Sequence, residues 1–300
     1  MNKFFLTTIG GYMLTHIDDR HRINKISTRA IIVVCLVLAF TLFSWRIEAA
    51  SRNTLFFYNP ESNINDFRSL KMLFDSYLSS NGWYQFQPFN NKSTFERFLE
   101  KRQNDVFLLS SWHYQNLVEQ GYSNLQPILV GTIDGESTYT KVLSTKKNVR
   151  NIKRLQGKRI ASAGDQDYTE RMLESMAFQQ RLRLNKPFKV LTVPKDIDAL
   201  MSVLFGMAQG ALTARHSLDT LAALNPRKYR LLRQHTESQA IMLPVVVVHQ
   251  PISTFSTEKL LDAIEDMPHY SNGQAILGML GLNGWKKLTR ADMRQLSLPR

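Results

Sequence analysis

The sequence predicts an α/β protein whose two lobes are interleaved along the chain. From Ser51 onwards, short apolar runs alternate with amphipathic stretches, a pattern typical of α/β proteins. The 300 residues contain 43% hydrophobic and 21% charged side chains, which is the composition of a folded protein. Because no long linker separates the halves, we expect residues 51–137 and 241–300 to build the first lobe and residues 138–240 the second.

Apolar periodicity separates strands from helices in the first lobe. Residues 54–58 form an apolar run that predicts a buried strand, and Asn59-Pro60 ends it. Between residues 64 and 78 the apolar side chains recur at helical spacing, and Gly82 ends that helix because glycine accepts a left-handed backbone. The same reasoning predicts strands at 84–89 and 105–109, a helix at 94–102, and a loop at 110–114.

The second lobe is expected to begin and end with strands that cross between the lobes. These are residues 139–143 and the β-branched run 241–248. Between them, the predicted strands are 158–162, 188–192, 210–214 and 229–232, and the predicted helices are 151–156, 168–182, 196–208 and 217–224. The chain then ends in helices at 258–266 and 271–280.

The apolar stretch within residues 1–50 has three interpretations. The uncharged apolar run 30–45 follows basic residues and precedes the small residues Ala49 and Ala50, which is the order of a secretory signal. Its length is about 16 residues, short for a membrane span of about 20. We expect a cleaved signal peptide, an uncleaved inner-membrane anchor or a buried core helix. Either of the first two places residues 51–300 in the periplasm.

Charge and residue usage narrow the possible functions. The net charge of +13 indicates an anionic ligand, anionic lipid or nucleic acid as partner, or simply a basic, well-mixed surface. The basic residues are scattered without interleaved aromatics, so no nucleic acid is expected. The single cysteine, Cys35, allows no internal disulfide. Without a catalytic motif or metal-ligand spacing among the seven histidines, we expect neither an enzyme nor a metal or cofactor.

Three segments resemble one family of transport proteins. Residues 104–114 resemble the strand and loop that introduce the first-lobe ligand loop of phosphonate-type ABC-transporter substrate-binding proteins. Residues 151–165, with Leu155-Gln-Gly-Lys-Arg159, are similar to the family's helix-to-strand junction, and residues 207–214 to the strand of its second-lobe ligand wall. The resemblance runs from about Thr54 to Leu280. It implies the type II periplasmic binding protein fold, in which two α/β lobes are joined by a two-strand crossover hinge around a ligand cleft.

The chain departs from the family pattern at two places. Family members that bind phosphonate usually present small hydroxyl residues at the second-lobe helix N-terminus, where residues 165–170 here carry three carboxylates. In the wall strand, Ala211 stands where the family commonly has an aspartate. These departures identify a divergent member and leave room for a degenerate cleft.

Ligands of open α/β folds bind at the carboxyl ends of the strands. This rule selects Asn59, Asp165 and ten candidate ligand-binding residues: Tyr58, Ser110, Ser111, Trp112, Tyr139, Thr140, Tyr168, Thr169, Arg215 and His216. The serines could donate to an oxyanion, the aromatic rings could stack on a flat ligand, and a guanidinium could grip a carboxylate or phosphate with two hydrogen bonds. Each type is also common in a structural role, as a loop residue, a core ring or a solvated cation.

These observations predict an extracytoplasmic solute-binding protein that closes on a small polar, anionic ligand. Its partner would be an ABC permease or a membrane sensor that recognises the closed form. The inner membrane becomes a further partner, through residues 30–45, if the signal is uncleaved. The alternatives are a membrane-anchored accessory or scaffold protein with a degenerate cleft, and an enzyme on the same fold.

Overall fold

A computed structural model describes the larger part of the chain. The described residues are 53–61, 64, 66–82, 84–102, 105–183, 186–250 and 255–296. The predicted signal or anchor, with Cys35, lies outside them. Within these ranges, no helix has the length and apolar character needed to cross a membrane.

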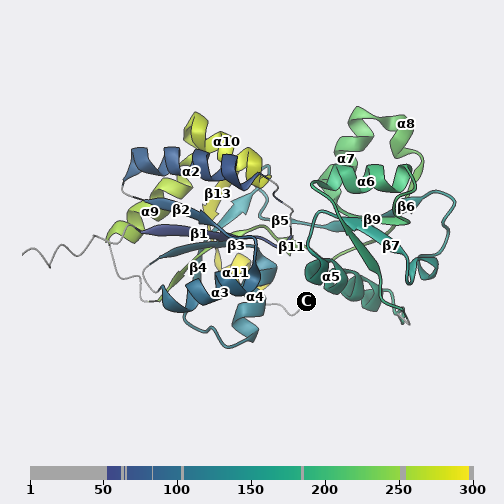
Figure 1. The fold of residues 1–300 in the computed structure, drawn as a ribbon, viewed down its shortest axis with the longest axis horizontal. Helices are drawn as coiled ribbons and strands as arrows, with labels where there is room; N and C mark the ends of the chain where they lie inside the picture. The colour runs from purple at the N-terminus through teal and green to yellow at the C-terminus, as the bar shows by residue number, and fades with distance from the viewer. Residues whose placement is uncertain are drawn as a thin grey trace, which may run out of the picture. The chain divides into compact units, whose positions relative to one another are not determined.

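The first lobe is built on a six-stranded mixed sheet of order β13-β4-β12-β3-β1-β2 (Figure 1). Its strands are β1 (Thr54–Tyr58), β2 (Gln85–Pro88), β3 (Val106–Leu109), β4 (Leu125–Thr132), β12 (Val245–His249) and β13 (Gly284–Lys287). β1 is parallel to β2 and β3, whereas β12 is antiparallel to β3 and β4. Every residue of β1 and β3 is buried, which explains why both strands are continuous runs rather than alternating patterns.

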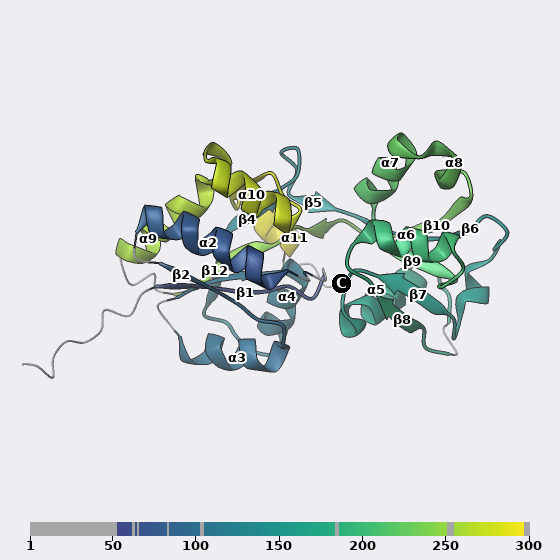
Figure 2. The same ribbon diagram turned by 45° about the horizontal axis from the view of Figure 1, so that its top comes forward.

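Helices cover both faces of this sheet. The lobe contains α2 (Phe67–Asn81), α3 (Lys92–Lys101), α4 (Ser111–Glu119), α9 (Phe255–Glu265), η2 (Met267–His269), α10 (Ser271–Leu280) and α11 (Arg290–Leu296). α2, α9 and α10 lie on one face, and α3 and α4 on the other (Figures 1 and 2). The core between them is aromatic: the Phe74 ring stacks on Phe86 with centroids 3.8 Å apart.

The second lobe is built on a five-stranded sheet of order β10-β6-β9-β7-β8. Its elements are β6 (Lys141–Lys146), η1 (Ile152–Leu155), β7 (Arg159–Ser162), α5 (Gln166–Gln179), β8 (Lys189–Thr192), α6 (Asp196–Leu204), β9 (Gly210–Ala214), α7 (Arg215–Leu224), α8 (Pro226–Tyr229) and β10 (Leu232–Glu237). β7 is parallel to β8 and β9, and β6 is antiparallel to β9 and β10. The helix α5 lies on one face, and α6 and α7 on the other (Figure 2).

Two short strands join the lobes. β5 (Thr138–Tyr139) pairs antiparallel with β11 (Ile241–Met242), in the register Tyr139↔Ile241. β5 leads into β6 of the second sheet, and β11 leads into β12 of the first. The predicted two-lobe α/β architecture with a two-strand crossover is thereby confirmed.

Two local predictions were wrong, and the start of one predicted helix was misplaced. The predicted strand 229–232 is the end of α8 and the start of β10, because Pro226 begins a helical turn that the Asn225 side chain caps, accepting from Lys228 N–H at 3.1 Å. The predicted loop 110–114 is instead the beginning of α4. The predicted helix 217–224 begins two residues earlier, at Arg215, directly after β9.

The sequence pattern also missed β4, β13 and α11. β4 contains Pro127 and Gly131, two residues that argue against a central strand. The pairing register of β12 with β4 shifts between Val246 and Val247, at the position opposite Pro127. The irregularity accommodates Pro127, which has no N–H to donate to the neighbouring strand. Local propensity therefore predicted no strand at this position.

Candidate functional site

Six side chains from both lobes and the crossover meet near the carboxyl ends of β1, β3 and β7. We call them the cleft cluster: Tyr58, Glu61, Trp112, Tyr139, Asp165 and Tyr168. Four of them are among the predicted ligand-binding residues, and the rule of carboxyl strand ends explains their convergence.

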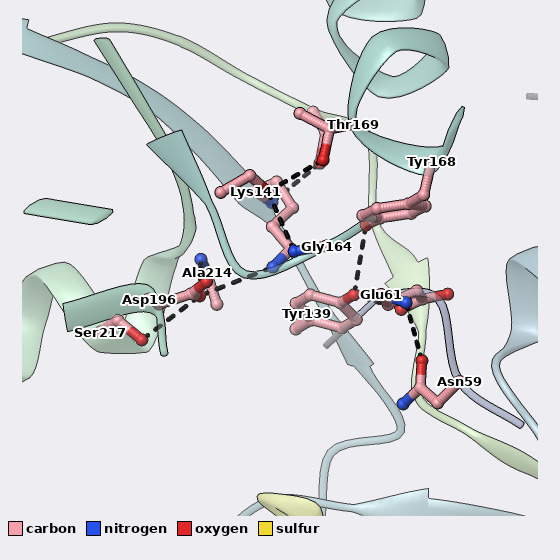
Figure 3. A network of polar contacts seen from close by, with 12 residues as sticks. Asn59, Glu61, Tyr139, Lys141, Gly164, Tyr168, Thr169, Asp196, Ala214 and Ser217 are labelled. Atoms are coloured by element: carbon pink, nitrogen blue, oxygen red, sulfur yellow. Dashed lines mark hydrogen bonds and ion pairs between the residues drawn. The ribbon is translucent and has the colours of Figure 1, made fainter. Parts of the chain in front are cut away.

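Glu61 lies at the centre of the cleft cluster and is 5% exposed. Its Oε2 accepts a hydrogen bond from Tyr139 Oη at 2.5 Å, and its Oε1 accepts from the backbone N–H of Trp112 at 3.3 Å. The N–H of Glu61 donates to Asn59 Oδ1 at 2.8 Å, which stabilises the turn after β1 (Figure 3). The carboxylate therefore connects the first lobe to the crossover.

Asp165, at the start of α5 in the second lobe, also connects the two lobes. It caps the N-terminus of α5 by accepting from Tyr168 N–H at 2.9 Å, and it accepts from Tyr58 Oη at 3.5 Å. Its own N–H donates to the carbonyl of Pro60 at 2.8 Å. The two lobes are thus joined by main-chain as well as side-chain hydrogen bonds.

Aromatic rings fill the space between these carboxylates. The fully buried Tyr168 ring meets Trp112 edge-on, with centroids 5.5 Å apart, and its Oη lies 3.5 Å from Tyr139 Oη (Figure 3). A Cβ added at Gly164 would lie 2.5 Å from Tyr168 Cδ1. Only glycine permits the ring to lie this close to the loop after β7.

Burial decides the protonation of the two bridging phenols. It raises the pKa of Tyr58 above the ordinary value, and the nearby Asp165 carboxylate raises it further. Burial also raises the pKa of Tyr139 well above the ordinary value, with Glu61 adding to the effect. Both phenols therefore keep their protons at neutral pH and act as donors to the carboxylates. Burial raises the pKa of Asp165 as well, and Asp167 adds to the shift.

A buried ion pair lies within the second lobe, next to the crossover. Lys141, at the start of β6 and 4% exposed, lies 3.5 Å from the Asp196 carboxylate (Figure 3). Asp196 also accepts from Ala214 N–H at 2.5 Å and from Ser217 Oγ at 3.5 Å. The Lys141 ammonium lies 5.6 Å from the centre of the Tyr139 ring, so this ion pair supports one wall of the cleft cluster.

A cavity of about 1130 Å³ lies beside the cleft cluster, between the lobes. One wall is a face of α4, the other a face of α5, and Ile241 and Met242 of β11 lie between them. Trp112 belongs to both the cavity and the cleft cluster. The charged lining residues are Glu119, Arg171, Glu174, Arg181 and Arg183. Small-molecule sites of proteins have volumes of about 300–1,000 Å³, so the space suffices for a small solute.

Three of the predicted hydroxyl residues have structural partners. Ser110 is the N-cap of α4 and accepts from His113 N–H at 3.1 Å. Ser111 Oγ donates to the carbonyl of Met242 at 2.5 Å, and Thr169 Oγ1 donates to Ser162 Oγ at 3.0 Å. All three hydroxyl residues are fully buried.

The other three predicted residues lie outside the cleft cluster. The Arg215 guanidinium is paired with Glu237, and its Nη1 donates to Gln234 Oε1 at 2.6 Å. The Thr140 hydroxyl also donates to Glu237. His216 is exposed on α7. A ligand role for these three residues stays a prediction.

Sequence reasoning missed Glu61, whereas the strand rule did reach Asp165, although the position of Asp165 beside a helix start favoured a capping role. Glu61 follows the end of β1 by three residues, beyond the Tyr58-Asn59 end that the strand rule selected. Extending that rule through the following turn would have included it. In the part of the chain that the structure describes, no cluster of three or more His, Cys, Asp or Glu residues could hold a metal ion.

Solved structures show a related fold. The chain matches a protein of Xanthomonas citri bound to chloride ion, with a TM-score of 0.59 and 13% identity over 82% of this chain and 95% of that one. PhnD1 from Prochlorococcus marinus, in complex with methylphosphonate, matches with a TM-score of 0.57 and 15% identity over 81% and 96%. A binding protein component of an ABC phosphonate transporter from Pseudomonas aeruginosa matches with a TM-score of 0.57 and 13% identity over 82% and 86%.

The sequence itself carries the family assignment. No protein with a curated description matches the chain. A family model described as an ABC transporter, phosphonate, periplasmic substrate-binding protein matches residues 59–293, which include the cleft cluster from Glu61 onwards. The expected transport family, rather than an enzyme family, is thereby confirmed. The chain belongs to the phosphonate family of periplasmic substrate-binding proteins of ABC transporters.

Proposed function

We propose that this substrate-binding protein takes up a small anionic solute between its lobes, beside the cleft cluster, and presents the closed form to an ABC permease. The observation that carries the proposal is the cavity between α4 and α5, which is lined from both lobes and from the crossover strand β11. A ligand held there contacts every part that moves when such a protein closes.

The charge of the cavity supports an anion. Arg171, Arg181 and Arg183 line it against Glu119 and Glu174, an excess of one positive charge. Arg171 is engaged with Asp167 at 3.0 Å, so Arg181 and Arg183 are the principal candidates for contact with the solute. The net charge of +13 over the whole chain acts in the same direction.

One observation favours a second candidate function. The lobes are already joined without any solute, through Asp165 N–H to Pro60 at 2.8 Å and Tyr139 Oη to Glu61 at 2.5 Å. A protein that is closed by its own side chains could serve as an accessory or scaffold for other proteins. The scaffold function is favoured over solute binding if no small molecule binds.

The test is a thermal-shift screen of the full chain against methylphosphonate, phosphate, sulfonates and amino acids. A solute at 100 times its dissociation constant stabilises the folded state by about 2.7 kcal/mol, which shifts the melting temperature visibly. Among variants, Arg183→Ala should weaken binding about tenfold, or by about 1.5 kcal/mol, since it removes a charged donor. Arg227→Ala, at an exposed arginine of α8, is the matched control.

A stabilising anion whose affinity depends on Arg183 but not on Arg227 supports the proposal. A flat screen with folded protein overturns it in favour of the scaffold. Equal losses in the two variants would show a general charge effect instead of a site in the cavity.

A further inference from the structure

Glu61 is a buried carboxylate without a cation. It is 5% exposed, and none of the ion pairs among the described residues involves it. Burying an ionised carboxylate is costly unless donors replace its water. Here the donors are the Tyr139 hydroxyl at 2.5 Å and the Trp112 N–H at 3.3 Å. A phenol and a helix N-terminal amide are the partners that a protein offers to a bound oxyanion.

The first turn of α4 is occupied by groups of the chain itself. Its nine residues begin at Ser111, after the N-cap Ser110. The His113 N–H is bonded to the Ser110 hydroxyl at 3.1 Å, and the Trp112 N–H is bonded to Glu61. The carboxylate of Glu61 thus stands where the positive end of the helix dipole favours an anion.

The position of Glu61 also matters for closure. Its turn follows β1 of the first sheet, whereas its acceptor bond from Tyr139 reaches the crossover strand that leads into the second sheet. The preceding residue, Pro60, accepts from Asp165 N–H of the second lobe at 2.8 Å. Losing the carboxylate would remove the bonds that tie Tyr139 of the crossover and the Trp112 N–H of α4 to the turn after β1.

We propose that Glu61 is a tethered anion that holds the ligand-free lobes closed. Its carboxylate substitutes for a ligand by bridging the α4 N-terminus and the crossover. The inference rests on the proposed function in one respect: lobes that Glu61 holds closed admit an anionic solute less readily, so the apparent affinity for the solute is reduced.

The first experiment measures closure without any solute. Spin labels are placed at two exposed positions, by Met72→Cys on α2 and Leu224→Cys on α7, in a Cys35→Ser background of the full chain. The distance distribution is recorded for the parent, for Glu61→Gln, which preserves shape, and for Glu61→Ala. Glu258→Gln, at an exposed carboxylate of α9 outside the cavity lining, is the control for lost charge.

We expect one short distance in the parent and in Glu258→Gln, and a population of longer distances in both Glu61 variants. Unchanged distributions in Glu61→Gln and Glu61→Ala would overturn the proposal. A melting transition retained by Glu61→Gln shows that longer distances reflect opening of the lobes and not unfolding.

The second experiment measures the affinity of the same proteins for methylphosphonate by calorimetry. We expect binding to both Glu61 variants to be at least tenfold tighter than to the parent, with the affinity of Glu258→Gln unchanged. Equal affinity in all four proteins would overturn the claim that Glu61 reduces the affinity for the solute. If the Glu61 variants open but bind no anion, closure by Glu61 is supported and the proposal that the protein binds an anionic solute is overturned. Failure of the Glu61 proposal and failure of the proposed function therefore give different results.

Discussion

At the scale of single residues, His113 stands out because its imidazole is fully buried. Neither ring nitrogen has a hydrogen-bond partner among the described residues, although Glu96 Oε1 lies 3.6 Å from Nε2. The ring packs against Tyr58 and Phe95, with centroid distances of 5.0 and 5.8 Å. Burial lowers the pKa of His113 to about 3, with Lys92 contributing to the shift.

This pKa predicts a loss of stability in acid. Below the ordinary value of 6.5, the unfolded chain takes up a proton that the folded protein refuses until the pH nears 3. The free energy of unfolding therefore decreases as the pH is lowered from 6.5 to about 3. His113 contributes up to about 1.4 kcal/mol per pH unit to this decrease. Urea unfolding across this range should give a shallower pH dependence for His113→Leu. The exposed His216→Leu is the control, and equal slopes in the two variants would contradict the prediction.

Arg181 is a second residue in an unfavourable position. It follows the end of α5 with a φ of 53°, a backbone conformation that favours glycine. Its N–H donates to Phe178 O at 2.9 Å, and the N–H of Leu182 donates to Ala177 O at 2.9 Å, so the helix end requires this conformation. An arginine that lines the cavity is kept here at a conformational cost.

Two substitutions of Arg181 should distinguish its effect on the free energy of unfolding from its effect on anion binding. Arg181→Gly should raise the free energy of unfolding by about 0.5–1 kcal/mol, because glycine adopts positive φ without strain. The same change should weaken anion binding, since a cavity cation is lost. Arg181→Ala keeps the strain and removes the charge, so it should lose affinity without gaining stability. Calorimetry and urea unfolding of both variants check this, and undiminished binding in both would remove Arg181 from the site.

At the scale of elements, α10 depends on one small residue. A Cβ at Gly273 would overlap the carbonyl oxygen of Met267 in η2, whereas a Cβ at Gly278 meets nothing within 4 Å. The two glycines therefore test close packing and helix propensity within a single helix.

Gly273→Ala should destabilise the protein by about 1–3 kcal/mol, because backbone atoms must move to admit the methyl group. Gly278→Ala should stabilise it by about 0.5–1 kcal/mol, because alanine restricts the unfolded chain and favours helix. Urea unfolding of both variants measures the difference. A Gly273→Ala variant that is as stable as the parent or more stable would show that the contact between α10 and η2 is not tight.

At the scale of the whole molecule, electrostatics should control how fast a solute arrives. The chain carries 38 Lys and Arg residues against 25 Asp and Glu residues. Such a field attracts anions over a distance that falls from about 30 Å at 0.01 M salt to about 10 Å at 0.1 M. The association rate of methylphosphonate, measured by stopped flow, should therefore decrease across this range. A rate independent of salt would show that the cavity lies outside the positive field.

The lobes and most elements could be predicted because their signals are local. β1 and β3 are apolar runs of strand length, and α2 and α10 show helical periodicity that ends at Gly82 and Gly281. β4 was missed because the pairing with β12, not local propensity, makes residues around Pro127 a strand. α8 was missed because a single capped turn has no periodicity to detect.

The sequence by itself determined the α/β class, the crossover, the family and four of the six cleft residues. Each of these depends on strand ends and residue patterns that are read along the chain. Only the tertiary structure decided that Glu61 and Asp165 meet Tyr139 and Tyr58, and that Arg215 pairs with Glu237. The reason is physical: these partners are 22 to 107 residues apart, so only tertiary packing brings each carboxylate and its donor together.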